Sequence, residues 1–198
     1  MTPTDKLWDI SDKLYVPDLA KYVLKLPYFK VWTGCANPKG HHYGKGGLAQ
    51  HVLEVCELAL LNNKYYGSPV DEAELFLACL FHDVGKLWDY IPTESSLPKS
   101  VAAAEVFGPN NNEYKDWVNS DHKYKIHHIT RSILVWNEAF DKENWDGRFE
   151  WDKDEVTHAI LAHHGRREYG SPVEPQSKLA WLLHSADMIS ARLCDSPS

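Results

Sequence analysis

The sequence lacks the features that would place it in a membrane or in a disulfide-stabilised secreted fold. No apolar run approaches the roughly 18 residues that a membrane-spanning helix needs. The N-terminal stretch MTPTDKLWDI has no basic and then apolar pattern of a signal peptide. The four cysteines are scattered and form no CxxC pair, which indicates reduced thiols rather than a disulfide framework. We therefore expect a cytoplasmic protein with no membrane partner.

Positive charge is also scarce. The chain has 21 Lys and Arg against 28 Asp and Glu, a formal net charge of -7. This balance argues against a broad surface that coats nucleic acid. The charge is uneven, however, because residues 30–47 carry three lysines and no acid. A local basic site is therefore compatible with the composition, and the oligomeric state stays open.

Alternating strand patterns and internal repeats are absent too, whereas helical apolar spacing recurs along the chain. The 198 residues suffice for one domain with a sizeable core. We predict an all-α fold, a single compact helical bundle over residues 1–198 with its motifs in 44–193. The expected helices are 17–26, 47–66, 68–82, 124–140, 153–164 and 177–193. The segment 89–123, broken by prolines and asparagines, predicts a loop-rich insertion that is either a substrate loop or a surface excursion.

Histidines and acids recur in these helical stretches among apolar neighbours. Ionisable groups on apolar faces are costly unless something pairs them, and imidazole with carboxylate suits divalent transition metals. Six ligands are too many for one catalytic ion with an open position, so we expect two ions, with Asp83 as the bridge. Manganese is the first expectation, and iron, cobalt or nickel are alternatives. The candidate ligands are His51, His82, Asp83, His128, His163 and Asp187.

The motifs GGLAQHVLEV, FHDVGKLWDY, HHITRS and ILAHHGRREYGSPVEP…LLHSADMISARL occur in this order along the chain. Together they resemble the HD-domain metal-dependent phosphohydrolases, and HHGRREYGSP is most similar to the HD domain of YhaM-type 3′–5′ exoribonucleases. The resemblance implies the same six metal ligands and a role for Lys86 in catalysis or phosphate contact. The residues before the first motif read as helical, so we expect no N-terminal nucleic-acid-binding barrel of the YhaM type in this sequence. Adjacent histidines leave two choices open, His127 or His128 and His163 or His164.

Further groups could hold a phosphorylated substrate. Lys45 lies in the glycine-rich start of a helix, where backbone amides can bind an anion. His164, Arg166 and Arg167 follow the candidate ligand His163, and arginine forks bind phosphate well. Alternatively, both arginines are solvent-exposed residues at the C-terminus of a helix and have no role in binding. Tyr43, Trp88 and Tyr169 are candidates for stacking a base.

A buried centre of this kind usually performs hydrolysis. The sequence therefore predicts a dinuclear phosphohydrolase with Asp83 and Lys86 at the reaction centre. Its substrate would be a nucleotide or a short single-stranded nucleic acid, with a YhaM-like 3′–5′ exonuclease as the most specific form. Three alternatives stay open: a nucleotide or deoxynucleoside triphosphate phosphohydrolase, a diiron oxygenase of the HD type acting on a small molecule, and a non-catalytic nucleotide sensor.

Overall fold

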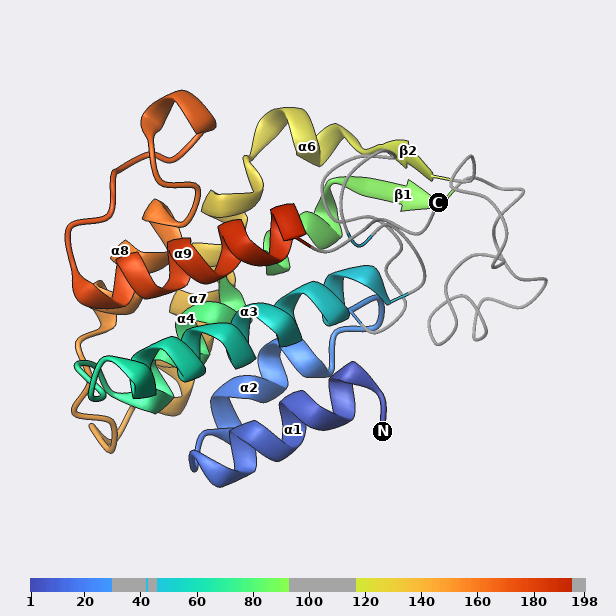
Figure 1. Ribbon diagram of the computed structural model, residues 1–198. Helices are drawn as coiled ribbons and strands as arrows, with labels where there is room; N and C mark the ends of the chain where they lie inside the picture. Colours follow the sequence, from blue (N-terminus) through green and yellow to red (C-terminus); the bar gives the residue numbers. More distant parts are fainter. Residues whose placement is uncertain (30–41, 43–45, 93–116, 194–198) are drawn as a thin grey trace.

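The computed structural model describes residues 1–29, 42, 46–92 and 117–193, and confirms the all-α fold (Figure 1). In chain order the elements are α1 (Pro3–Lys13), α2 (Pro17–Leu24), α3 (Gly47–Tyr65), α4 (Glu72–Phe81), the 3-10 helix η1 (Val84–Trp88), β1 (Tyr90–Pro92), β2 (Trp117–Asn119), α6 (Asp121–Lys125), α7 (His128–Glu143), α8 (Lys153–Ala162), the 3-10 helix η3 (Arg167–Tyr169) and α9 (Lys178–Leu193). Among these described residues, no helix is both long and apolar enough to cross a bilayer.

Helix α4 forms the centre of the bundle because it is apolar on all sides. Every residue from Leu75 to Phe81 is buried, as expected for a helix with neighbours all round. Helices α3, α8, α9, α7 and α2 all contact α4. In Figure 1, α3 and α9 run side by side across the molecule, with α1 and α2 on the far side of α3. The helices that carry the candidate ligands therefore meet around one core.

Two helix boundaries differ from the sequence prediction. The helix expected from residue 68 begins at Glu72, because the Asp71 side chain caps it by accepting hydrogen bonds from the backbone N–H groups of Ala73 and Glu74. Ser68 has φ +54°, which is outside the helical range. The helix expected over 124–140 is divided into α6 and α7, since His127 has extended backbone and caps α7.

The segment predicted as loop-rich, 89–123, has ordered ends. Strands β1 and β2 pair antiparallel, with Ile91 opposite Val118, and α6 follows at once. Three-residue strands are too short to show an alternating pattern, so the sequence did not reveal this ribbon. The ribbon brings the two ends of the segment together. Residues 93–116, the centre of the predicted insertion, lie outside the described residues.

Candidate metal centre

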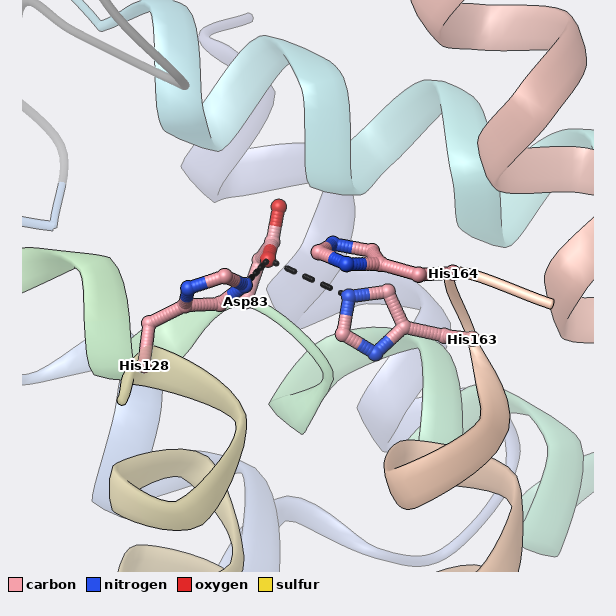
Figure 2. Close-up of side chains that lie close together, drawn as sticks. All are labelled: Asp83, His128, His163 and His164. Carbon is pink, nitrogen blue, oxygen red and sulfur yellow. Dashed lines mark ion pairs between the residues drawn. The ribbon is translucent and has the colours of Figure 1, made fainter. Parts of the chain in front are cut away.

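The six candidate ligands lie together, although five separate helices or helix ends supply them. His51 is in the second turn of α3, His82 and Asp83 follow α4, His128 begins α7, His163 follows α8, and Asp187 is on α9. All six are buried. Figure 2 shows Asp83, His128, His163 and His164 pointing toward one another between these helices.

A glycine allows one of the close approaches on which the cluster depends. A Cβ atom on Gly85 would lie 2.0 Å from the carbonyl oxygen of His128, so only glycine lets η1 pack against the start of α7. The backbone N–H of Gly85 also donates a hydrogen bond of 2.9 Å to Ser132 Oγ. The HDVGK motif thus places Asp83 and Lys86 beside His128.

The ligands form two groups that share Asp83. One group holds Asp83, His128, His163 and His164, the other His51, His82 and Asp83, and within each group the potential donor atoms lie within 4.8 Å of one another. The two oxygens of Asp83 face different groups. Oδ1 lies 3.6 Å from His128 Nε2 and 3.5 Å from His163 Nε2. Oδ2 lies 3.5 Å from His51 Nε2 and 3.4 Å from His82 Nε2.

Asp187 joins the second group. Its Oδ1 lies 3.1 Å from His51 Nε2 and 3.8 Å from His82 Nε2. Donors that bind one ion at about 2.0–2.2 Å each lie about 3–4 Å from one another. The separations in both groups therefore match two adjacent ions joined by a bridging carboxylate.

Three buried atoms in the first group lack hydrogen-bond partners among the described residues: Asp83 Oδ1, His128 Nε2 and His163 Nε2. A buried polar atom without a partner costs about 1–3 kcal/mol. Three such atoms around one point fit a cation that would satisfy all of them. The donor set thus fits a divalent metal on chemical grounds as well as on distance.

The histidines also present the correct tautomer. His82 Nδ1 lies 2.6 Å from the carbonyl oxygen of Cys79, and His163 Nδ1 lies 2.7 Å from that of Ile160. A carbonyl oxygen only accepts, so each Nδ1 carries the proton and donates it. The lone pair is then on Nε2, the atom that faces Asp83. Such hydrogen bonds orient metal-binding histidines in proteins.

A longer hydrogen-bonded chain orients His51. Ser190 Oγ donates its one proton to Glu54 Oε2 at 3.0 Å, and therefore accepts from His51 Nδ1, which is 3.0 Å away. Glu54 also contacts His42 Nε2 at 2.8 Å and accepts from Gln50 Nε2 at 2.8 Å. We call Glu54 and Ser190 the His51 relay. In a neutral His51 ring, the proton is then on Nδ1, and Nε2, the atom that faces the carboxylates, is free to bind a metal ion.

Electrostatics favour the protonation states that metal binding needs. Burial opposes the charge of Asp83, but Lys86 and then the surrounding imidazoles outweigh burial and hold the pKa of Asp83 well below its usual value. Burial lowers the pKa of His82. Burial and the charge of Lys86 together hold the pKa of His128 well below its usual value. These two imidazoles are thus neutral, and Asp83 is ionised.

His51 differs from these histidines. Burial disfavours its charge, yet hydrogen bonds with Asp187 and then Asp83 raise its pKa. The same two carboxylates attract a divalent cation to Nε2, and a cation there takes the place of a proton. The raised pKa therefore marks a cation-attracting position.

The residues predicted to contact substrate differ in how close they lie to the candidate ligands. Lys86 is buried, and its Nζ lies 2.5 Å from Asp83 Oδ2. His164 lies with the first group of ligands, and burial lowers its pKa to about 4. Arg166 and Arg167 are exposed. Lys45 and Tyr43 lie outside the described residues, and Trp88 packs under Arg131, whose guanidinium carbon is 5.6 Å from the ring centre.

The structure distinguishes the two members of each adjacent histidine pair. His128 lies in the first group, whereas His127 Nδ1 accepts a hydrogen bond of 3.4 Å from the Ile129 N–H and caps α7. Both His163 and His164 lie in the group, but only His163 is fully buried. Sequence reasoning missed the His51 relay. Its one signal was the spacing of Gln50 and Glu54 along α3, which is common on solvated helix faces.

The helical bundle and its two groups of His and Asp donors, which share Asp83, define a protein built to hold divalent metal ions. The HD domain family matches residues 48–192 of the chain, and the protein belongs to this family, whose members are metal-dependent hydrolases. No solved structure matches the chain.

Proposed function

We propose that this protein is a dinuclear phosphohydrolase that cleaves phosphodiester or phosphate-ester bonds in single-stranded nucleic acid or nucleotides. The observation that carries the proposal is the position of the Asp83 carboxylate, whose two oxygens face two separate groups of candidate ligands. Paired divalent ions serve in-line displacement at phosphorus, because they stabilise both the attacking and the leaving oxygen. Centres of this kind occur in phosphatases and nucleases.

The residues present would hold the two ions in distinct sets. Asp83, His128, His163 and His164 would hold one ion, and His51, His82, Asp83 and Asp187 the other. Manganese suits a mixed set of imidazole and carboxylate, as do iron, cobalt and nickel. When bound, two such ions supply Lewis-acid stabilisation of the phosphoryl group and lower the pKa of a nearby water toward neutrality.

The protein's own side chains prepare the site for an anion. Lys86 lies against Asp83 Oδ2 in a buried position, so its charge acts where little water screens it. We propose Lys86 as one contact of the substrate phosphate and Arg166, an exposed residue three positions after His163, as a second. Both cations would neutralise charge that grows on the phosphoryl oxygens during the reaction.

The most specific form of the proposal is a YhaM-like 3′–5′ exonuclease. It rests on the segment HHGRREYGSP, which covers residues 163–172. This segment contributes His163 and His164 to the first group of ligands and then passes through η3. It therefore joins the centre to the surface over which a strand would approach. A nucleotide phosphohydrolase is the coarser form of the same proposal.

The test is a time course with end-labelled single-stranded RNA and DNA in Mn²⁺, beside phosphate release from nucleotides. Asp83→Asn should abolish turnover while the circular dichroism spectrum stays that of the wild type. Asp9→Asn, an exposed acid on α1, is the matched control and should keep full activity. Shortening from the 3′ end supports the exonuclease, and release from nucleotides alone supports the coarser form. Undiminished turnover by Asp83→Asn refutes the proposal.

A further inference from the structure

A cavity lies on the solvent side of α9, lined by residues that adjoin the ligand pair His163–His164. Its volume is about 370 Å³, within the usual range for small-molecule sites of roughly 300–1,000 Å³. One wall is a stripe on α9 made by Trp181, His184 and Met188, which are spaced to share a helix face. The other wall comes from the segment between Gly165 and Gln176.

Two aromatic rings at this cavity are open to solvent. The Trp181 side chain is 54% exposed and that of Tyr169 is 63% exposed. Singly exposed aromatics are common on protein surfaces, but these two differ from the others because both line the same cavity. The Trp181 ring meets the His184 ring edge-on, at 5.8 Å between centres. This single contact orients Trp181 and can cover at most one face of its ring, which leaves the other face for a flat ligand.

The cavity and the ligand groups share a wall. His184 Nδ1 is hydrogen-bonded to the carbonyl oxygen of His163 at 2.7 Å. Gly165 has φ +82°, and a Cβ atom there would lie 2.4 Å from the His184 ring. Gly165, which directly follows the ligand pair His163–His164 in the sequence, therefore lines the cavity. Two residues of the cavity lining are thus tied to the ligand pair: Gly165 by the chain and His184 by its hydrogen bond to the His163 carbonyl oxygen.

The polar lining selects the chemistry of the occupant. Arg166 lines the cavity, and its guanidinium can bind phosphate or stack on a ring. Glu174 and Gln176 line it as well, and they offer the acceptors and donors that base edges require. The Gln176 backbone N–H is fixed by a hydrogen bond of 3.1 Å to His158 Nε2. A flat heterocycle attached to a phosphate matches all of these groups.

We propose that this cavity is a stacking subsite for the nucleobase joined to the phosphate at the metal centre, with Trp181 as its platform. The inference rests on the proposed function, because it takes the phosphate to lie at the centre. It adds that the enzyme recognises the base as well as the backbone. Stacking on an aromatic side chain accepts every base, so recognition should be tolerant of sequence.

The test measures binding of a short single-stranded oligoadenylate with hydrolysis-resistant phosphorothioate linkages, by fluorescence anisotropy in Mn²⁺. The same strand with abasic sites is the comparison. Trp181→Ala should weaken binding of the oligoadenylate about fivefold to a hundredfold, the range measured for loss of one base stack. Binding of the abasic strand should not change. Trp181→Phe should recover most of the loss, since it keeps a ring.

Trp145→Ala is the matched control, because Trp145 is 82% exposed and does not line the cavity. Competition by adenosine monophosphate identifies the source of the base: displacement at equal affinity indicates a free nucleotide, and weak displacement indicates a strand. Equal losses for the oligoadenylate and the abasic strand overturn the subsite even if the enzyme cleaves nucleic acid. Base-dependent binding through Trp181 without any cleavage supports the subsite and refutes only the hydrolytic function.

Discussion

Replacement of Ser190 by alanine tests whether the His51 relay controls metal binding. Ser190 is buried and joins His51 Nδ1 to Glu54 Oε2 by two contacts of 3.0 Å. The substitution leaves the His51 ring without the partner that fixes its orientation and tautomer. Loss of such a partner typically lowers metal affinity about 10–100-fold. It also leaves a buried N–H unpaired, which should cost about 1–3 kcal/mol of unfolding free energy.

The assay is a Mn²⁺ titration by calorimetry, together with urea denaturation of the metal-free protein. Ser11→Ala is the matched control, because Ser11 is equally buried and donates a hydrogen bond of 2.8 Å to the Trp8 carbonyl oxygen in α1. Both variants should lose stability, but only Ser190→Ala should lose metal affinity. Equal Mn²⁺ affinities for the two variants would refute the reasoning, since the relay would then serve the fold alone.

Two further predictions concern stability. Gly165→Ala should destabilise more than Gly67→Ala by about 1–3 kcal/mol in urea denaturation, because both glycines have left-handed φ but only Gly165 would place its Cβ against a neighbour; equal losses would contradict this. A hydrogen bond with Lys21 lowers the pKa of Glu143 below its usual value of 4.5. The Lys21–Glu143 ion pair should stabilise the fold by about 1 kcal/mol or less. This contribution is present above pH 4.5 and is lost as the pH falls through the folded-state pKa of Glu143. Glu143→Gln should therefore reduce the free energy of unfolding at neutral pH, with a deficit that shrinks in acid, and a deficit independent of pH would count against the ion pair.

The gathering of these histidines and acids in one buried cluster could be predicted because its signal is local. His51 and Asp187 are each surrounded by apolar residues at helical spacing, and a buried charge in such a setting needs a partner. The bridging role of Asp83, which came from counting the candidate ligands, stays a prediction. The structure adds which oxygen of Asp83 faces which group, a result of how α4 and η1 pack on α7 that no spacing along the chain contains.

The His51 relay and the cavity could not be predicted from the sequence, because both depend on contacts between distant parts of the chain. Ser190 and Glu54 are common residues, and their contact joins positions 136 residues apart. Trp181 has the spacing of an ordinary helix residue, and only the path of residues 165–176 across α9 converts its exposed face into a cavity wall. The start of α4 was missed because the Asp71 cap competes with Pro69, and the side-chain cap satisfied two N–H groups at once.

We propose that local charge, rather than the overall balance, determines which substrate the centre attracts. The chain as a whole is acidic, with a net charge of -7, which would repel a polyanion at long range. At the centre, two divalent ions against the carboxylates of Asp83 and Asp187 would leave a charge of about +2, and buried Lys86 adds a further cation. Such a site would hold one phosphate strongly, whereas the acidic surface would give little support to a long strand. This combination favours a nucleotide or the end of a single strand over an extended nucleic-acid track, and it agrees with a cavity of about 370 Å³ beside the centre.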